Sequence, residues 1–252
     1  MTSIAVTGKG GTGKTVISAM LIKFLSESKK VLAIDADPAS SLPLALGVKI
    51  KRTIGDIREE IAAPSRIPFY ESVPIDMMLD QKIGEILVKT PTFSLLAMGR
   101  SEGPGCYCLI NDILRHAIDK FSSKFEAIVI DCEAGLEHLS RRTMRNIDVM
   151  LIVSDPTVRG IKTAETIKNI SNSLEIGFSH IYLVLNKVTD ELEFFNEMIE
   201  KTGIELIGVV PEDENIHRHD LIGRPITDLP DDSPSVIAVR KIFNRLLDAK
   251  IL

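Results

Sequence analysis

Eight consecutive residues near the start of the chain have the types and spacing of a phosphate-binding turn. They fit the pattern G-x-x-x-x-G-K-[ST] and read Gly8, Lys9, Gly10, Gly11, Thr12, Gly13, Lys14, Thr15. Glycines let successive backbone N–H groups point toward phosphate oxygens, and the start of a following helix adds partial positive charge. In this pattern Lys14 contacts the β- and γ-phosphates and the Thr15 hydroxyl binds Mg²⁺. We predict a nucleoside triphosphate site, with a glycine-rich turn that holds no ligand as the alternative.

Three carboxylates stand at the ends of apolar segments that we expect to be buried strands. Asp131 ends the segment 127–131, and Asp35 and Asp37 lie at the end of the segment 31–36. Because ligands of parallel sheets bind at the carboxyl ends of the strands, we expect all three beside Thr15. Asp131 has the position of a magnesium ligand, and a carboxylate at Asp35 or Asp37 could orient the attacking water or hold the metal. Helix capping and turn formation are the structural alternatives.

The elements that must position these residues alternate along the whole chain. Apolar runs typical of buried strands recur at 3–7, 31–36, 127–131, 149–154, 181–186 and 206–210, with amphipathic helical patterns between them. We predict a single α/β domain over residues 1–252, built on a doubly wound, mostly parallel sheet. Residues 52–105 hold five of the 12 prolines and two short apolar segments, at 75–79 and 93–98. We interpret this region as an irregular insertion.

Composition narrows the function classes. Thirty basic and 35 acidic residues give a net charge of −5, which disfavours a bulk electrostatic role on nucleic acid or anionic lipid. No apolar run reaches the roughly 18 to 20 residues of a membrane span, and the chain opens on a strand rather than a signal peptide. We therefore expect a cytoplasmic protein that binds neither nucleic acid nor membrane. Its three cysteines do not form a disulfide framework.

A second lysine, Lys9, is not needed to bind the nucleotide held by the same chain, because Lys14 already contacts the phosphates of that nucleotide. The variant K-G-G-x-G-K-T resembles the deviant Walker A family of division-site and plasmid-partitioning ATPases and the nitrogenase iron protein. The resemblance implies Mg²⁺-dependent ATP hydrolysis in a nucleotide-sandwich homodimer, with Lys9 reaching the phosphates of the partner chain. It also implies that Asp37 positions the water, and that switch segments follow Asp35 and Asp131.

The same resemblance implies where adenine binds. Asn186-Lys187 follows one predicted strand, and Val210-Pro211-Glu212-Asp213 follows the next. Both look like the adenine-binding elements of the family. The resemblance therefore implies that Asn186 reads the base and that the backbone near Pro211 and Asp213 lines it.

Cys106 and Cys108 lie in a Gly- and Pro-rich stretch, 103–108, that reads as a loop or a helix start. A Cys-x-Cys pair can direct two thiolates at one soft metal ion, and incidental thiols or a redox pair are the alternatives. Two thiolates are half of a four-coordinate site, so a symmetric dimer would complete it with Cys106 and Cys108 of both chains. Metal binding and nucleotide state would then be coupled.

The stretch G-x-x-C-Y-C, with Ala-Gly-Leu-Glu-His-Leu at 134–139 and Leu-Ala-Met-Gly at 96–99, resembles the CooC-type ATPases of carbon monoxide dehydrogenase maturation. The resemblance implies a metallochaperone that binds Ni²⁺ (or Zn²⁺) at Cys106 and Cys108 and serves a client nickel enzyme such as carbon monoxide dehydrogenase. One alternative is a MinD/ParA-like positioning ATPase, whose membrane-bound form would need a basic amphipathic helix. We expect the C-terminal helix, 235–252, to pack in the core instead.

A second alternative is an iron–sulfur reductase resembling the nitrogenase iron protein. Cys132 directly follows Asp131 inside a predicted strand, and we interpret it as a small core hydrophobe, which disfavours a bridging cluster. His217 and His219 have metal-ligand spacing, but the polar residues around them indicate a solvated surface segment.

Overall fold

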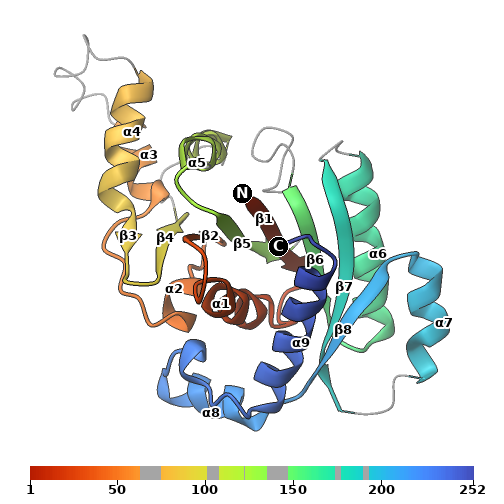
Figure 1. The fold of residues 1–252 in the computed structure, drawn as a ribbon. Coiled ribbons are helices and arrows are strands. Elements are labelled where there is room, and N and C mark those ends of the chain that lie inside the picture. Colours follow the sequence, from red (N-terminus) through yellow and green to blue (C-terminus); the bar gives the residue numbers. More distant parts are fainter. Residues whose placement is uncertain (63–74, 101–107, 122, 135–146, 174–176, 190–192) are drawn as a thin grey trace.

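The computed structural model describes residues 1–62, 75–100, 108–121, 123–134, 147–173, 177–189 and 193–252. Within these residues eight strands form one sheet in the order β3-β4-β2-β5-β1-β6-β7-β8 (Figure 1). The strands are β1 (Thr2–Gly8), β2 (Val31–Ala36), β3 (Val88–Lys89), β4 (Phe93–Ala97), β5 (Ala127–Ala134), β6 (Ile147–Ser154), β7 (Phe178–Val188) and β8 (Glu205–Pro211). Only β3 and β4 pair antiparallel in the described sheet. The predicted doubly wound, mostly parallel sheet is confirmed.

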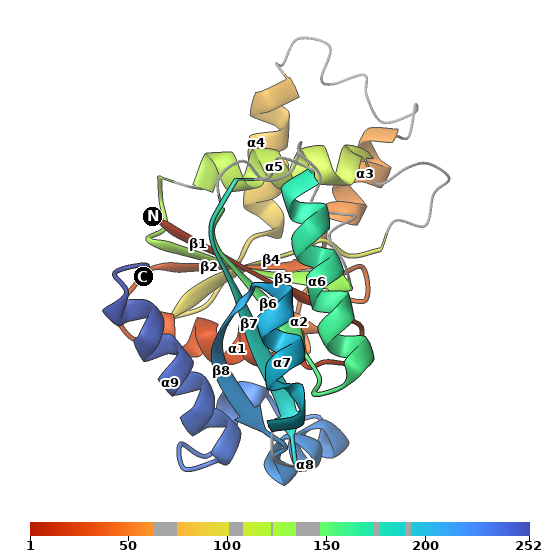
Figure 2. The ribbon, with the colours of Figure 1, turned by 90° about the vertical axis from the view of Figure 1, so that its right-hand side faces the viewer.

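Helices cover both faces of this sheet (Figure 2). One face carries α3 (Ile54–Ala62), α4 (Ile75–Ile86), α5 (Cys108–Phe121), α6 (Val158–Ser173) and α7 (Glu193–Thr202). The other carries α1 (Lys14–Leu25), α2 (Leu42–Ala45), α9 (Pro234–Asp248) and a 3₁₀ turn, Ile226–Asp228. Helix α8 (Glu214–Ile222) follows β8 directly. The core consists of two apolar layers, one on each face of the sheet.

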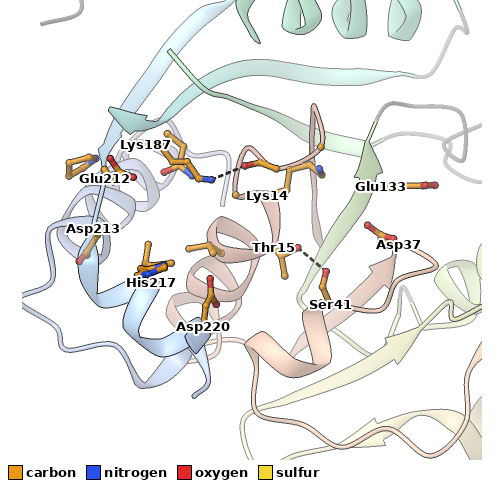
Figure 3. Close-up of a pocket in the computed structure, with 17 residues that line it drawn as sticks. Lys14, Thr15, Asp37, Ser41, Glu133, Lys187, Glu212, Asp213, His217 and Asp220 are labelled. Atoms are coloured by element: carbon orange, nitrogen blue, oxygen red, sulfur yellow. Dashed lines mark hydrogen bonds between the residues drawn. The ribbon is translucent and has the colours of Figure 1, made fainter. Parts of the chain in front are cut away.

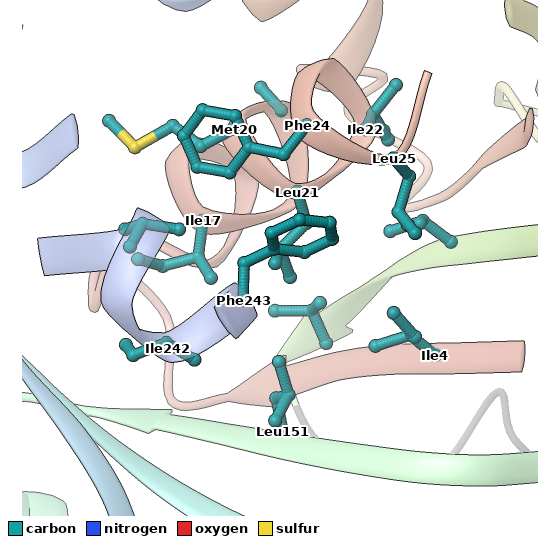
Figure 4. Packing of buried hydrophobic residues seen from close by; sticks show 14 of the residues in the cluster. Ile4, Ile17, Met20, Leu21, Ile22, Phe24, Leu25, Leu151, Ile242 and Phe243 are labelled. Atoms are coloured by element: carbon teal, nitrogen blue, oxygen red, sulfur yellow. The ribbon is translucent and has the colours of Figure 1, made fainter. Parts of the chain in front are cut away.

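The apolar side chains of each strand alternate between the two faces of the sheet and so contribute to both core layers. Successive side chains of a strand point to opposite faces, so Ile4 and Val6 pack beneath α1 and α9 while Ala5 packs beneath the opposite helices. Phe24 of α1 and Phe243 of α9 meet with ring centroids 5.8 Å apart (Figure 4). The apolar face of α9 is thus buried in the core, as predicted. Within the described residues, no helix is both long and apolar enough to cross a membrane.

The described part of the segment 52–105 is more regular than its prolines indicated. The apolar run 75–79 opens helix α4, and the run 93–98 contains β4, which pairs in parallel with β2 from Val31 opposite Phe93 to Asp35 opposite Ala97. Strand β4 is therefore an internal strand of the main sheet. The sequence pattern did not reveal this strand, because a five-residue buried strand is too short to show a clear period. The irregular insertion as a whole stays a prediction. The single-domain organisation stays a prediction.

Candidate nucleotide-binding site

The predicted phosphate-binding turn connects β1 to α1. Gly8 ends β1, and Gly13 caps α1 in the left-handed conformation with φ of 90°. A Cβ atom added to Gly13 would lie 2.2 Å from Asn186 Nδ2, and one added to Gly8 would lie 2.1 Å from the Val153 carbonyl oxygen. Both positions require glycine because neighbouring strands approach the turn so closely.

A cavity of about 550 Å³ opens beside this turn (Figure 3). Its walls come from the turn and α1, from the carboxyl ends of β2, β5, β7 and β8, and from α8. The lining residues are Gly10, Gly11, Gly13, Lys14, Thr15, Val16, Asp37, Ser41, Glu133, Asn186, Lys187, Pro211, Glu212, Asp213, Ile216, His217 and Asp220. The cavity thus lies at the strand ends where parallel sheets bind ligands.

Thr15 and Asp131 form a polar pair at one wall. The Thr15 hydroxyl donates to Asp131 Oδ2 at 2.7 Å, and the Ser18 hydroxyl donates to Asp131 Oδ1 at 2.8 Å. Thr15 Oγ1 also lies 3.2 Å from Ser41 Oγ. Burial raises the pKa of Asp131 to about 6, and the hydrogen bonds from Thr15 and Ser18 oppose that rise. Hydroxyl and carboxylate oxygens are the ligands that Mg²⁺ prefers, so this donor set fits the predicted metal.

The two lysines of the turn have different surroundings. Lys14 is buried, lines the cavity, and donates from Nζ to the Lys9 carbonyl oxygen at 3.2 Å. The Lys9 side chain is 37% exposed and does not line the cavity, and its Nζ lies 3.9 Å from Asp155 Oδ2. The positive charge of Lys14 is therefore held beside the turn, whereas that of Lys9 is directed elsewhere.

Asp35 and Asp37 also differ. Asp37 lines the cavity. Asp35 is completely buried, and its carboxylate accepts the backbone N–H groups of Asp37 at 3.0 Å and Leu42 at 3.1 Å. Burial raises the pKa of Asp35 to about 7, against the effect of these N–H donors. Asp35 thus holds the loop after β2. Asp35 does not line the cavity, and its role as a metal ligand stays a prediction.

Residues of both predicted adenine elements line the cavity. Asn186 is buried and donates from Nδ2 to the Thr12 carbonyl oxygen at 2.8 Å. Lys187, with φ of 60°, donates from Nζ to the Gly11 carbonyl oxygen at 2.9 Å. Both contacts tie the end of β7 to the phosphate-binding turn. Pro211 lines the same cavity, so the predicted phosphate and base elements share one site.

Asp213 lines the cavity, but its carboxylate has structural partners. It accepts the backbone N–H of Asn215 at 2.9 Å, which caps the start of α8. It also accepts the backbone N–H and the hydroxyl of Ser235, at 3.1 and 2.6 Å. These bonds favour the charged form and keep the pKa of Asp213 below its usual range in spite of burial. The Asp213 side chain is thus held between the starts of α8 and α9, and the role of the nearby backbone in lining a base stays a prediction.

The sequence prediction missed Ser41, Glu133, His217 and Asp220 as lining side chains. Glu133 stands two positions after Asp131 on β5, so the strand period could have placed both on one face. His217 and Asp220 are separated by one helical turn on α8. The interpretation of this segment as solvated surface is wrong for His219, which is buried and donates from Nδ1 to the Pro225 carbonyl oxygen at 2.9 Å.

Cys106 lies outside the described residues, as do Gly135 and His138. Cys108 begins α5, and its side chain also lies outside what the structure describes. Cys132 is buried in the core and burial raises the pKa of its thiol, so its predicted role as a core hydrophobe is confirmed. In the part of the chain that the structure describes, no three His, Cys, Asp or Glu residues are grouped to hold a metal ion.

Comparison with known proteins agrees with the fold and the phosphate-binding turn. The CobQ/CobB/MinD/ParA nucleotide binding domain matches residues 3–226. An uncharacterized ATP-binding protein of Methanocaldococcus jannaschii is 44% identical over 253 residues, 98% of this chain and 99% of the relative. The carbon monoxide dehydrogenase accessory protein CooC of Rhodospirillum rubrum is 33% identical over 240 residues, 90% of this chain and 89% of the relative.

Among solved structures, the septum site-determining protein MinD of Pyrococcus horikoshii, complexed with Mg-ADP, has the same fold. It superposes with a TM-score of 0.73 at 23% identity, over 100% of this chain and 99% of that one. The family match covers most of the chain, including the turn from Gly8 to Thr15, the Asp131 wall and Asn186. The chain therefore belongs to the CobQ/CobB/MinD/ParA family of nucleotide-binding proteins.

Proposed function

We propose that the protein is a Mg²⁺-dependent ATPase that acts as an ATP-dependent homodimer and delivers nickel to a client metalloenzyme such as carbon monoxide dehydrogenase. The observation that carries the ATPase proposal is one cavity lined by Lys14, Thr15 and Asp37, with Asp131 bonded to Thr15 at its wall. The 33% identical CooC relative and the Cys-x-Cys sequence support the nickel proposal.

The residues of the cavity divide the work of ATP hydrolysis. Backbone N–H groups of the turn and Lys14 would bind the phosphates, and Thr15 and Asp131 would hold Mg²⁺. When bound, Mg²⁺ neutralises charge on the β- and γ-phosphates. Asp37 lies in the wall formed by the loop after β2, where its carboxylate can accept a proton from a water and orient it. Asp35 positions Asp37 by accepting its backbone N–H.

Lys9 supports the homodimer in this proposal. Its side chain is partly exposed and lies outside the cavity of its own chain, while Lys14 already occupies the wall. A charge in this position can serve a site on a second copy. In the dimer each Lys9 would stabilise negative charge on the nucleotide of the partner subunit, and hydrolysis would release the two chains.

Nickel is the cargo of this ATPase. Cys106 and Cys108 of both chains would supply four thiolates, which suit a soft or borderline ion such as Ni²⁺ or Zn²⁺. Because the site would exist only in the dimer, ATP binding and metal binding would strengthen each other. Cys132 has no part in this site, because it is buried in the core, where burial raises the pKa of its thiol.

Native mass spectrometry with Ni²⁺ and ATP tests the nickel proposal. The natural chain, the double variant Cys106→Ala/Cys108→Ala and the control Cys132→Ala are compared. One nickel ion per dimer in the natural chain and in Cys132→Ala, and none in the double variant, is the expected result. Nickel retained by the double variant, or a natural dimer that binds none, would exclude the shared thiolate site.

A MinD-like positioning ATPase is the second candidate, and the fold likeness to MinD favours it. Such a protein needs a surface for membrane or nucleoid. The apolar face of α9 does not offer one, because Val239, Ile242 and Leu246 are buried against the core. Co-sedimentation with anionic vesicles in the presence of ATP would separate the two candidates: a pellet that depends on ATP supports positioning, and its absence supports nickel delivery.

A bridging iron–sulfur cluster, as in a reductase, is the third possibility, and anaerobic reconstitution tests it. Visible absorbance that is lost in Cys106→Ser would support the cluster over nickel delivery.

A further inference from the structure

Helix α8 forms the wall of the cavity opposite the phosphate-binding turn, and three contacts fix its orientation. The Asp213 carboxylate caps its first turn and also binds Ser235 at the start of α9. The Asn215 side chain donates to the Ser233 hydroxyl at 2.9 Å. At the other end, buried His219 donates to the Pro225 carbonyl oxygen. These bonds hold one face of α8 against the protein, so its remaining face has a defined position.

The cavity-lining residues of α8 are Ile216, His217 and Asp220. Positions three and four apart lie on the same side of a helix, which places all three side chains toward the cavity. Figure 3 shows His217 and Asp220 on the α8 side of the site, across from the start of α1 that carries Lys14 and Thr15. The wall therefore presents one apolar group, one imidazole and one carboxylate.

The polar groups of His217 and Asp220 are available to a ligand. Within the described residues, no hydrogen bond or ion pair engages the Asp220 carboxylate or the His217 ring. This distinguishes Asp220 from Asp213, whose carboxylate accepts three hydrogen bonds. It also distinguishes His217 from His219, which has a backbone partner.

A carboxylate in a site for a polyphosphate needs a reason, because like charges repel. At Asp131 the proposed Mg²⁺ would offset this repulsion, and at a carboxylate away from the metal the ligand can offset it by offering hydrogen-bond donors. A nucleotide carries donors on its ribose and on its base. Because the phosphates would lie along the turn and the base beside Asn186 and Pro211, the ribose would lie between them. Its 2′- and 3′-hydroxyl groups match the two oxygens of one carboxylate, as in dinucleotide-binding folds.

We propose that Asp220 reads the ribose of the bound nucleotide by accepting hydrogen bonds from its hydroxyl groups, while His217 packs beside the sugar and base. The site is then selective for ribonucleotides over deoxyribonucleotides. This inference rests on the proposed function, because it requires ATP in the cavity. It adds two residues of α8 to the phosphate and base elements.

Binding of ATP, 2′-deoxy-ATP and 3′-deoxy-ATP, measured by isothermal titration calorimetry with Mg²⁺, tests the proposal. The natural chain is expected to bind ATP about 10-fold more tightly than either deoxy analogue, as loss of a hydrogen bond to a charged group predicts. Asp220→Ala should lower the affinity for ATP more than the affinity for either analogue, because each analogue already lacks one of the two hydroxyl groups, so the ratio of ATP affinity to analogue affinity should fall toward one. His217→Ala should weaken all three nucleotides equally. Glu214→Gln is the control, because Glu214 belongs to the same helix but does not line the cavity.

Equal loss of affinity for ATP and both analogues in Asp220→Ala would overturn the ribose assignment, as would a natural chain that binds all three equally. His217→Ala with unchanged affinities would overturn the packing role of His217. A natural chain that binds none of the three nucleotides would overturn the proposed ATPase itself. Failure of the inference and failure of the function are therefore distinct results.

Discussion

The Thr15 hydroxyl donates a hydrogen bond to Asp131 Oδ2 at 2.7 Å, although the two residues stand 116 positions apart in the chain. Strands β1 and β5 pair in parallel with Val6 opposite Asp131, and the turn after β1 returns the chain to the same strand end. Ser18, one turn further along α1, binds the other oxygen of Asp131. The carboxylate is thus oriented before any ligand enters.

The Thr15 hydroxyl can be removed without changing the side-chain shape. In Thr15→Val, we expect affinity for ATP with Mg²⁺ to fall at least ~10-fold, because one metal ligand is lost. Affinity for ATP in EDTA should change little. Thr15→Ser keeps the hydroxyl and should behave like the natural chain. Titration calorimetry with and without Mg²⁺ checks this, and an equal loss under both conditions would refute the metal role of Thr15.

Asp35 should make stability depend on pH. Its pKa is raised from 3.8 to about 7 in the folded protein and returns to its ordinary value on unfolding. Between these values the folded state binds more protons, so rising pH lowers the free energy of unfolding across this window. The favourable contribution is complete below the unfolded pKa and is lost as pH passes the folded pKa.

Asp35→Asn removes this titration, so its stability should depend less steeply on pH, by a few kcal/mol across the window. Urea unfolding of the nucleotide-free protein between about pH 4 and 8 measures the difference. Asp131 titrates in both proteins, and because its charge contributes to the raised pKa of Asp35, the difference reports Asp35 together with its interaction with Asp131. Parallel stability curves for the two proteins would contradict the prediction.

Alanine substitutions at Gly13 and Gly11 distinguish the cost of backbone strain from the cost of a steric clash. Both have positive φ, but a Cβ atom would meet Asn186 Nδ2 at 2.2 Å in Gly13 and nothing within 4 Å in Gly11. Gly11→Ala should cost roughly 1–2 kcal/mol from strain alone. Gly13→Ala should cost more and weaken ATP binding further, because Asn186 must move. Equal unfolding free energies for the two variants would show that Asn186 does not restrict the turn.

Helix α9 offers two adjacent leucines with opposite environments. Leu246 is fully buried and Leu247 is 39% exposed. Leu246→Ala should lower the free energy of unfolding by about 2–5 kcal/mol, and Leu247→Ala by less than about 1 kcal/mol. Urea denaturation distinguishes the two. Similar small losses would mean that the apolar face of α9 is not packed in the core. The alternative in which α9 binds a membrane would then regain support.

The sequence predicted those parts of the site whose functional residues are adjacent in the chain. The turn from Gly8 to Thr15 has a fixed spacing, and the apolar segments 31–36 and 127–131 carry Asp35 and Asp131 near their carboxyl ends. Spacing could not decide which of Asp35 and Asp37 faces the cavity. That orientation depends on backbone donors in the loop after β2, including Leu42, seven positions beyond Asp35.

The sequence did not predict that α8 lines the cavity, for a similar reason. His217 and Asp220 line the cavity because α8 is held in place by contacts distant in sequence, such as the bond from Asp213 to Ser235, 22 positions away, and the pairing of β8 with β7. A polar segment with two histidines looks solvated when its tertiary partners are unknown. Strand β4 was missed since its burial comes from pairing with β2, which no period within Phe93–Ala97 reveals.

The most direct test of the proposed ATPase mixes two variants that are each expected to be inactive. Lys9→Ala keeps Asp37 but lacks the lysine for its partner, and Asp37→Ala keeps Lys9 but cannot orient water. If Lys9 acts across the dimer, equal mixing should restore up to about one quarter of the natural ATP hydrolysis rate, since half of the dimers carry one complete site. A mixture as inactive as its components, or full activity of Lys9→Ala alone, would contradict catalysis across the dimer.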